Sequence, residues 1–145
     1  MQQVITLEYA VVAIIGGGTL GRRIALMWGS MGSPVMLADT AAKARADALE
    51  FYQANIHARI KHIGSHSAGQ LEVVEDNALA VKNAWLVIEA VPECLELKRN
   101  IFREIEEAAP LDAILATNSS SFKSRELITL VKDASRGQHH ASDLS

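Results

Sequence analysis

Short apolar runs alternate along this chain with longer segments in which apolar residues recur at helical spacing. Four runs, at 9–15, 35–38, 84–90 and 113–117, consist mainly of apolar residues. Such runs are typical of strands that are buried on both faces of a parallel sheet. Residues 71–76 predict a further, shorter strand. The pattern therefore predicts a parallel sheet whose strands are joined by helices.

The first predicted helix joins the first two strands, and Gly32 follows it as a C-terminal stop. Its apolar positions are Leu20, Ile24, Met27, Trp28 and Met31. A long helix, rich in alanine at its start, is predicted from Ala41 to about Ile63. Strand, helix and strand within about thirty residues form the βαβ unit of parallel sheets.

The second half of the chain repeats this alternation. A weak helical segment runs through Val81, a helix that follows Pro92 ends near Pro110, and another helix is predicted around 124–131. The helix after Pro92 has one apolar face, formed by Leu97, Ile101, Ile105 and Ala108. Strands that alternate with helices predict an α/β fold, a Rossmann-like doubly wound, mostly parallel sheet with helices on both faces.

Length and composition fit one domain. The chain has 145 residues, of which 49% are hydrophobic, so it has enough apolar material for a single core. We expect that domain to cover residues 1–134. The polar residues after Ser135 predict that 135–145 form a truncated or disordered tail.

Charge and cysteine content narrow the classes of partner and compartment. The net charge is −3 without long runs of one sign, which gives no reason to expect nucleic acid or an anionic membrane surface as partner. The longest apolar run, Ala10–Ile15, is too short to span a bilayer, and the first residues do not resemble a signal or transit peptide. With Cys94 as the only cysteine, we expect a reducing, cytoplasmic location.

The segment "IGGGTLG" raises the first functional hypothesis. Gly16, Gly18 and Gly21 fit the spacing G-x-G-x-x-G between a predicted strand and a predicted helix. In a dinucleotide site the glycines permit a tight turn, close approach of a pyrophosphate, and close packing of helix on strand. The helix that follows directs free N–H groups at the phosphates. The candidate cofactor-binding residues here are Gly16, Gly17, Gly18, Thr19, Leu20 and Gly21.

Asp39 ends the next predicted strand and lies 18 positions after Gly21 (39 − 21 = 18). A carboxylate there accepts hydrogen bonds from ribose hydroxyls and repels a 2′-phosphate, so the sequence favours NAD over NADP. The alternative is a structural glycine turn beside a solvated aspartate, and the complete βαβ context favours the dinucleotide. Lys43 would soften the repulsion of a 2′-phosphate unless it lies on a solvated helix face, which is the preferred interpretation.

Two further strands end in polar residues, at 89–93 and at 118–121. Ligands of open parallel sheets lie beyond the carboxyl ends of the strands. Together with the glycine segment and Asp39, four strand ends therefore carry glycine or polar residues on the side where a ligand would bind. Histidines at positions 57, 62 and 66 suggest a metal site, but Gly64 interrupts their helix and no acidic cluster joins them, so no metal is expected.

The segments "IGGGTLGRRIA", "VMLAD", "VIEAVPECLELKRNIF" and "ILATNSSS" resemble the N-terminal NAD-binding domain of the 3-hydroxyacyl-CoA dehydrogenase family. The resemblance covers most of Val11 to about Ser121. It implies an NAD-dependent oxidoreductase of fatty acid metabolism that oxidises a 3-hydroxyacyl-CoA and passes a hydride to NAD. The implied partner is a small-molecule substrate, an acyl-CoA or a hydroxy acid.

The resemblance also implies roles for single residues. Glu93 and Lys98 would lie along the cofactor near its nicotinamide half, Ser120 would bind the substrate oxygen as a catalytic residue, and Asn118 would shape that loop. From the sequence alone, Glu93 and Lys98 also fit exposed charges in the first turns of a helix. The serines also fit a polar loop that caps the helix near Ser124.

The resemblance ends in the last residues. Hydroxyl oxidation needs a base, which in this family is a histidine after Gly-x, and His139 of "GQH" fits that position. The family's following aromatic pair and Asn-Pro are not found after His139, and no candidate remains for its paired glutamate. Two alternatives to the family reaction therefore stay open: a catalytically incomplete NAD-binding module, and a dehydrogenase of small hydroxy acids. Apolar surface left without a second domain would favour a homo-oligomer.

Overall fold

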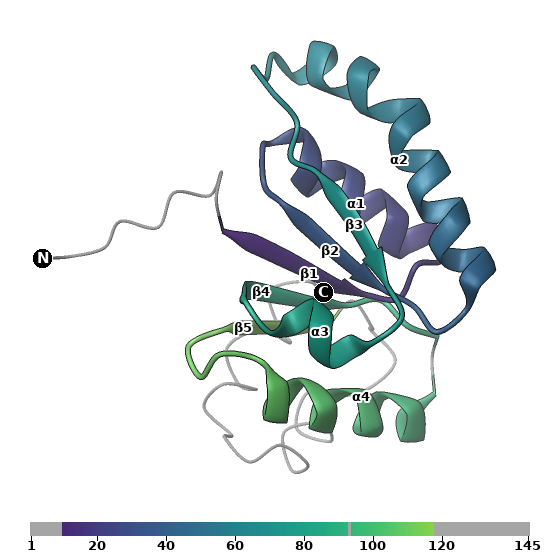
Figure 1. Ribbon diagram of the computed structural model, residues 1–145, viewed down its shortest axis with the longest axis vertical. Helices are drawn as coiled ribbons and strands as arrows, with labels where there is room; N and C mark the ends of the chain where they lie inside the picture. Colours follow the sequence, from purple (N-terminus) through teal and green to yellow (C-terminus); the bar gives the residue numbers. More distant parts are fainter. Residues whose placement is uncertain (1–9, 93, 118–145) are drawn as a thin grey trace, which may run out of the picture.

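The structure, a computed structural model, describes residues 10–92 and 94–117. Five strands form one sheet in the order β3-β2-β1-β4-β5 (Figure 1). The strands are β1 (Val11–Ile15), β2 (Val35–Ala38), β3 (Leu71–Val74), β4 (Ala84–Glu89) and β5 (Ile114–Thr117). The helices are α1 (Thr19–Ser30), α2 (Ala42–Ile63), α3 (Asn77–Val81) and α4 (Leu95–Ala108).

Every pair of neighbouring strands is parallel. α1 and α2 cover one face of the sheet, and α3 and α4 cover the other (Figure 1). The chain moves outward from β1 to β3 and then returns to place β4 on the other side of β1. The predicted doubly wound α/β fold is therefore confirmed, with its topological switch point between β1 and β4.

The core has two halves, one on each face of the sheet. Alternate residues of β1 supply both halves: Val12 and Ile14 pack toward α1 and α2, while Ala13 and Ile15 pack toward α3 and α4. All four of these side chains are buried. This two-sided burial explains why the strands are recognisable in the sequence as continuous apolar runs.

The helix predicted after the first strand is present as α1, but its contact face differs from the predicted stripe. The buried positions are Gly21, Ala25 and Gly29, together with Ser30, whereas Leu20, Met27 and Met31 are 47%, 41% and 47% exposed. A Cβ atom at Gly29 would lie 2.1 Å from the hydroxyl oxygen of Tyr52 on α2. Small residues therefore form the contact face because the neighbouring backbone and side chains approach α1 closely.

α4 also differs in part from its predicted face. Ile101 and Ile105 are buried as expected, but Leu97 is 39% exposed, and Lys98 and Phe102 take the remaining inward positions. The periodicity missed Lys98 because a lysine counts as a polar residue in the pattern. The helix predicted around 124–131, the tail at 135–145 and residues 1–9 lie outside the described residues.

None of the helices within residues 10–92 and 94–117 combines the length and the apolar character that a bilayer span requires.

Candidate cofactor-binding site

The junction between β1 and α1 contains two glycines, Gly16 and Gly21, that no other residue replaces without strain. Gly16 has a φ of +111°, a region that side chains rarely adopt, and its N–H donates to the carbonyl oxygen of Ala38 at 2.8 Å. A Cβ atom at Gly16 would also lie 2.7 Å from the carbonyl oxygen of Ala90. A Cβ atom at Gly21 would lie only 1.8 Å from the carbonyl oxygen of Gly16. The first and third glycines of the motif thus bring the start of α1 directly against the end of β1.

Gly18 has a different environment. A Cβ atom at this position would meet no atom within 4 Å, so the second glycine is open on the side where a ligand would approach. Gly18 is also the N-cap of α1, which has no side-chain cap hydrogen bond and no acidic residue in its first turn. The first N–H groups of a helix lack partners within the helix and attract anions. The start of α1 therefore fits a pyrophosphate group.

Asp39 lies immediately after β2 and is held against this turn. Its Oδ2 atom accepts a hydrogen bond from the N–H of Gly17 at 2.8 Å, and its Oδ1 atom accepts one from the N–H of Ala41 at 2.8 Å. The guanidinium of Arg45 donates to the carbonyl oxygens of Asp39 and Thr40, at 2.8 and 3.2 Å. The carboxylate is half-buried, and its remaining lone pairs suit the hydroxyls of a ribose.

Lys43 lies on the surface of α2. Its Nζ atom forms an ion pair with Asp47 Oδ2 at 2.8 Å, and its side chain is 87% exposed. The hydrogen bond from this ammonium holds the pKa of Asp47 below its usual value. The position agrees with the interpretation of Lys43 as part of a solvated helix face.

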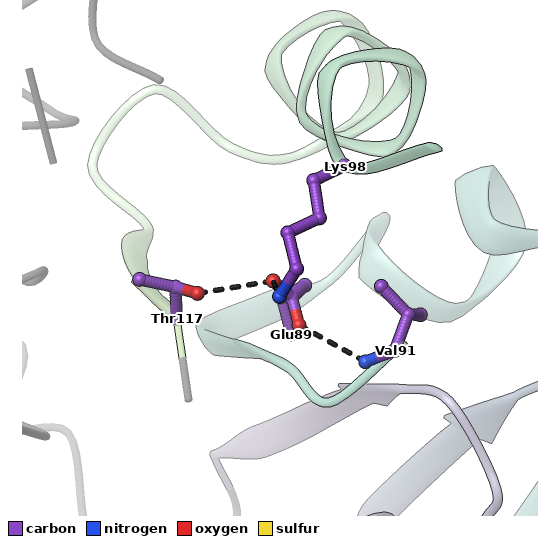
Figure 2. A network of polar contacts seen from close by, with 4 residues as sticks. All are labelled: Glu89, Val91, Lys98 and Thr117. Carbon is purple, nitrogen blue, oxygen red and sulfur yellow. Dashed lines mark hydrogen bonds and ion pairs between the residues drawn. The ribbon is translucent and has the colours of Figure 1, made fainter. Parts of the chain in front are cut away.

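A buried polar network lies at the carboxyl ends of β4 and β5 (Figure 2). Glu89 Oε1 accepts hydrogen bonds from Lys98 Nζ at 2.6 Å and from Thr117 Oγ1 at 3.0 Å, and Glu89 Oε2 accepts one from the N–H of Val91 at 3.0 Å. Lys98 is 0% exposed and Glu89 is 1% exposed. The alternative in which Lys98 is an exposed charge is therefore wrong. It lies on the face of α4 that also carries Ile101 and Phe102, three and four residues further on, and this face packs on the sheet.

Sequence reasoning singled out Lys98 but missed Glu89, its ion-pair partner, and Thr117, which donates to the same carboxylate. Glu89 is an acid at the end of an otherwise apolar strand, and Thr117 ends the neighbouring strand. An acid inside an apolar run, followed by a lysine nine residues later, was the signal for a buried pair. The structure places Lys98 Nζ beside the carboxyl ends of β4 and β5, which is the side that the family resemblance assigns to the nicotinamide half.

The two halves of the site meet at the switch point. The N–H of Ala90 donates to the carbonyl oxygen of Ile15 at 2.8 Å, and Gly16 approaches Ala90 closely. The connection from β4 to α4 therefore adjoins the glycine turn. Asp39 lies on the β2 side of that turn, and the network of Glu89 lies on the β4 side. A dinucleotide that crosses a switch point places one nucleotide on each side.

Several predicted site residues lie outside the described residues, and their roles stay predictions: Glu93, Asn118, Ser120 and His139. Within residues 10–92 and 94–117, no group of three or more histidine, cysteine, aspartate or glutamate side chains is arranged to hold a metal ion. The candidate site is thus built from the glycine turn, Asp39 and the polar network.

Comparisons with known proteins agree with this geometry. Residues 11–142 match the family described as 3-hydroxyacyl-CoA dehydrogenase, NAD binding domain. A probable 3-hydroxyacyl-CoA dehydrogenase of Caenorhabditis elegans is 34% identical over 135 residues, which cover 86% of this chain and 45% of that protein. The 3-hydroxyadipyl-CoA dehydrogenase of Escherichia coli is 35% identical over 133 residues, which cover 86% of this chain and 27% of the enzyme.

Solved structures give the same result. The 3-hydroxybutyryl-CoA dehydrogenase of Escherichia coli K12 superimposes with a TM-score of 0.77 at 32% identity, over 88% of this chain and 28% of that chain. A diketoreductase that acts on dicarbonyl compounds superimposes with a TM-score of 0.74 at 32% identity, over 85% of this chain and 46% of that chain. The chain thus spans less than half the length of these relatives. It belongs to the 3-hydroxyacyl-CoA dehydrogenase family and carries the NAD-binding domain of that family.

Proposed function

We propose that the site binds NAD with its pyrophosphate at the start of α1 and its adenine ribose against Asp39. The observation that carries this proposal is the hydrogen bond from the N–H of Gly17 to Asp39 Oδ2, at 2.8 Å. It joins the two parts of the dinucleotide motif, which are 22 residues apart in the sequence, at one point of the sheet edge. The open side of Gly18 leaves room for the phosphates beside them.

The same geometry supports a preference for NAD over NADP. The carboxylate of Asp39 is fixed by two backbone donors, so it does not turn away from a ribose that carries a 2′-phosphate. Two like charges about 4 Å apart repel by about 1 kcal/mol in water and by about 4 kcal/mol near a protein surface. Such a repulsion corresponds to a preference of about fivefold to several hundredfold.

For the reaction of the whole protein, we propose oxidation of the hydroxyl group of a 3-hydroxyacyl-CoA in fatty acid metabolism, in the cytoplasm. Bound NAD would accept the hydride in that reaction. The residues of this chain would supply the rest: the glycine turn and Asp39 hold the cofactor in place. Ser120 would bind the substrate oxygen, and His139 would take the hydroxyl proton as general base. Both positions fall within the matched residues 11–142. The support is that named relatives act on 3-hydroxyadipyl-CoA and 3-hydroxybutyryl-CoA.

A second candidate is a substrate without coenzyme A. The likeness to a diketoreductase that acts on dicarbonyl compounds, at 32% identity, favours this candidate. A third, the catalytically incomplete NAD-binding module, rests on the sequence after His139, which departs from the family pattern.

Two titrations and one assay separate these functions. We expect calorimetry to show binding of NAD that is at least about fivefold tighter than binding of NADP. The absorbance of NADH is then followed with acetoacetyl-CoA and with a panel of free dicarbonyl compounds. Consumption of NADH with acetoacetyl-CoA alone supports the acyl-CoA reaction, and consumption with free dicarbonyls alone supports the second candidate. NAD binding without any turnover supports the incomplete module, and absence of NAD binding refutes the proposed site.

A further inference from the structure

The carboxylate of Glu89 connects three chain segments at one end of the sheet (Figure 2). Its Oε1 atom binds Lys98 of α4 and Thr117 of β5, and its Oε2 atom binds the N–H of Val91 in the connection between β4 and α4. These contacts span 2, 9 and 28 residues of sequence. A single side chain therefore joins the ends of β4, β5 and α4.

Stability alone is a poor reason for this arrangement. Removal of two charges from water costs free energy that their attraction often does not recover, so an apolar pair of similar volume is frequently as stable or more stable. The other inward positions of α4 follow that rule, because Ile101, Phe102 and Ile105 are apolar. The charged pair occurs only at the end of α4 nearest the carboxyl ends of the strands. Ligands of open parallel sheets bind beyond these carboxyl ends, so the pair lies on the side of the sheet where a ligand would bind.

The network lies on one side of the candidate site. Val91 follows Ala90, whose carbonyl oxygen would be 2.7 Å from a Cβ atom at Gly16, so the connection that Glu89 fixes forms a wall next to the glycine turn. Thr117 is the last residue of β5, and it pairs with Glu89 at the same end of the sheet. Asp39 lies on the opposite side of β1, because β2 and β4 flank that strand. Displacement of the network would therefore move the β4 side of the site and leave the Asp39 side in place.

We propose that Glu89 is a positioning residue for the nicotinamide half of the cofactor, acting through Lys98 and Thr117. The inference rests on the proposed NAD site. It predicts that loss of the Glu89 charge weakens contacts with the nicotinamide ring and leaves contacts with the ADP-ribose part of the cofactor unchanged. A purely structural role would weaken both halves together.

The test compares two ligands that differ in the nicotinamide ring. NADH and ADP-ribose share the adenosine diphosphate and the second ribose, and only NADH carries the ring. Calorimetry on the full chain gives the ratio of their Kd values for the wild type and for Glu89→Gln. We expect Glu89→Gln to weaken NADH binding at least about tenfold while the Kd of ADP-ribose changes less than about twofold. The matched control is Glu104→Gln, the same chemical change on the exposed side of α4, where Glu104 accepts a hydrogen bond from Asn77 at 3.0 Å. It should leave both Kd values unchanged.

A second variant keeps the test decisive if loss of the Glu89 charge unfolds Glu89→Gln. The double variant Glu89→Met/Lys98→Met replaces both charges with apolar side chains and should retain the melting temperature of the wild type or exceed it. We expect it to lose the NADH preference as well. A wild-type ratio in a folded variant, or equal weakening of both ligands, would overturn the positioning role. Failure of the wild type to bind ADP-ribose is a separate result, because it refutes the proposed NAD site itself and the inference with it.

Discussion

Replacement of Gly18 and of Gly21 by alanine should separate cofactor binding from folding within one turn. At Gly18 the new Cβ atom meets nothing within 4 Å, and the backbone, with φ −69° and ψ −168°, suits alanine. Loss of glycine at an N-cap costs at most about 1 kcal/mol. At Gly21 the new Cβ atom would lie 1.8 Å from the carbonyl oxygen of Gly16, a backbone atom that has no room to move. Overpacking of this kind costs about 1–3 kcal/mol or more, which exceeds the gain of about 1 kcal/mol from alanine in a helix.

The two variants are expected to lose different properties, Gly18→Ala its NAD affinity and Gly21→Ala its thermal stability. Gly18→Ala should unfold within a few degrees of the wild type and bind NAD at least about tenfold more weakly, because a methyl group would occupy the approach of the pyrophosphate. Gly21→Ala should lower the melting temperature by about 5 °C or more. Thermal unfolding followed by circular dichroism, together with calorimetric titration of NAD, measures both. Gly64→Ala is the control for NAD affinity. Gly64 ends α2 with a φ of +72°, so alanine there should lower the melting temperature without altering NAD affinity. Wild-type affinity in Gly18→Ala would refute the assignment of the pyrophosphate to the start of α1.

Three further predictions follow from other contacts. Asp39→Asn should narrow the preference for NAD over NADP by about tenfold, because the repelling charge is lost; an unchanged ratio in paired titrations would contradict the role of that carboxylate. Gly29→Ala should destabilise the fold by about 1–3 kcal/mol in chemical unfolding, since its Cβ atom would lie 2.1 Å from the hydroxyl oxygen of Tyr52. Lys43→Ala should not measurably change the melting temperature at neutral pH, because its ion pair with Asp47 is exposed. The pKa of Asp47 is lowered in the folded state, so any contribution of the ion pair to stability is present above about pH 4 and is lost as the pH falls through that lowered pKa. If the difference in melting temperature between the wild type and Lys43→Ala grows on acidification, the sign of this argument is wrong.

The sequence was sufficient to predict the sheet, the glycine turn and the position of Asp39. Each of these depends on residue types that have few structural alternatives. Continuous apolar runs predicted strands with two buried faces, and Gly16 stands where the chain needs a positive φ. Asp39 was predictable because the length of a βαβ unit places the end of the second strand next to the first turn.

The contact face of α1 was not predictable from hydrophobic periodicity. The pattern gives weight to large side chains such as Leu20 and Met27, which the structure leaves partly exposed. The contact is made by Gly21, Ala25 and Gly29, which are buried because they are small. How closely two elements approach depends on the three-dimensional arrangement of both, and a local pattern in one helix does not contain that information.

The buried network was hidden for a related reason. A lysine is rarely buried without a partner of opposite charge. Lys98 pairs with Glu89 on β4, and Thr117 on β5 donates a hydrogen bond to the same carboxylate. Their proximity follows from the strand order, which places β5 beside β4. The sequence contains the residue types of a buried network, but only the fold shows that Glu89, Lys98 and Thr117 lie together.

The register of the parallel strands indicates which positions of the domain can be substituted without unfolding it. Ile15 pairs with Ala38 and with Glu89, Ala38 pairs with Val74, and Glu89 pairs with Thr117. The last residues of all five strands therefore form one continuous row across the sheet. Behind this row lie the apolar residues that make the domain fold, and beyond it lie the loops that would contact a ligand. Mutational libraries confined to loop positions beyond the row, with Gly16 and Gly21 kept, would therefore explore new cofactor and substrate preferences with little loss of folded protein. Libraries that also include positions behind the row would change folding stability and ligand preference together.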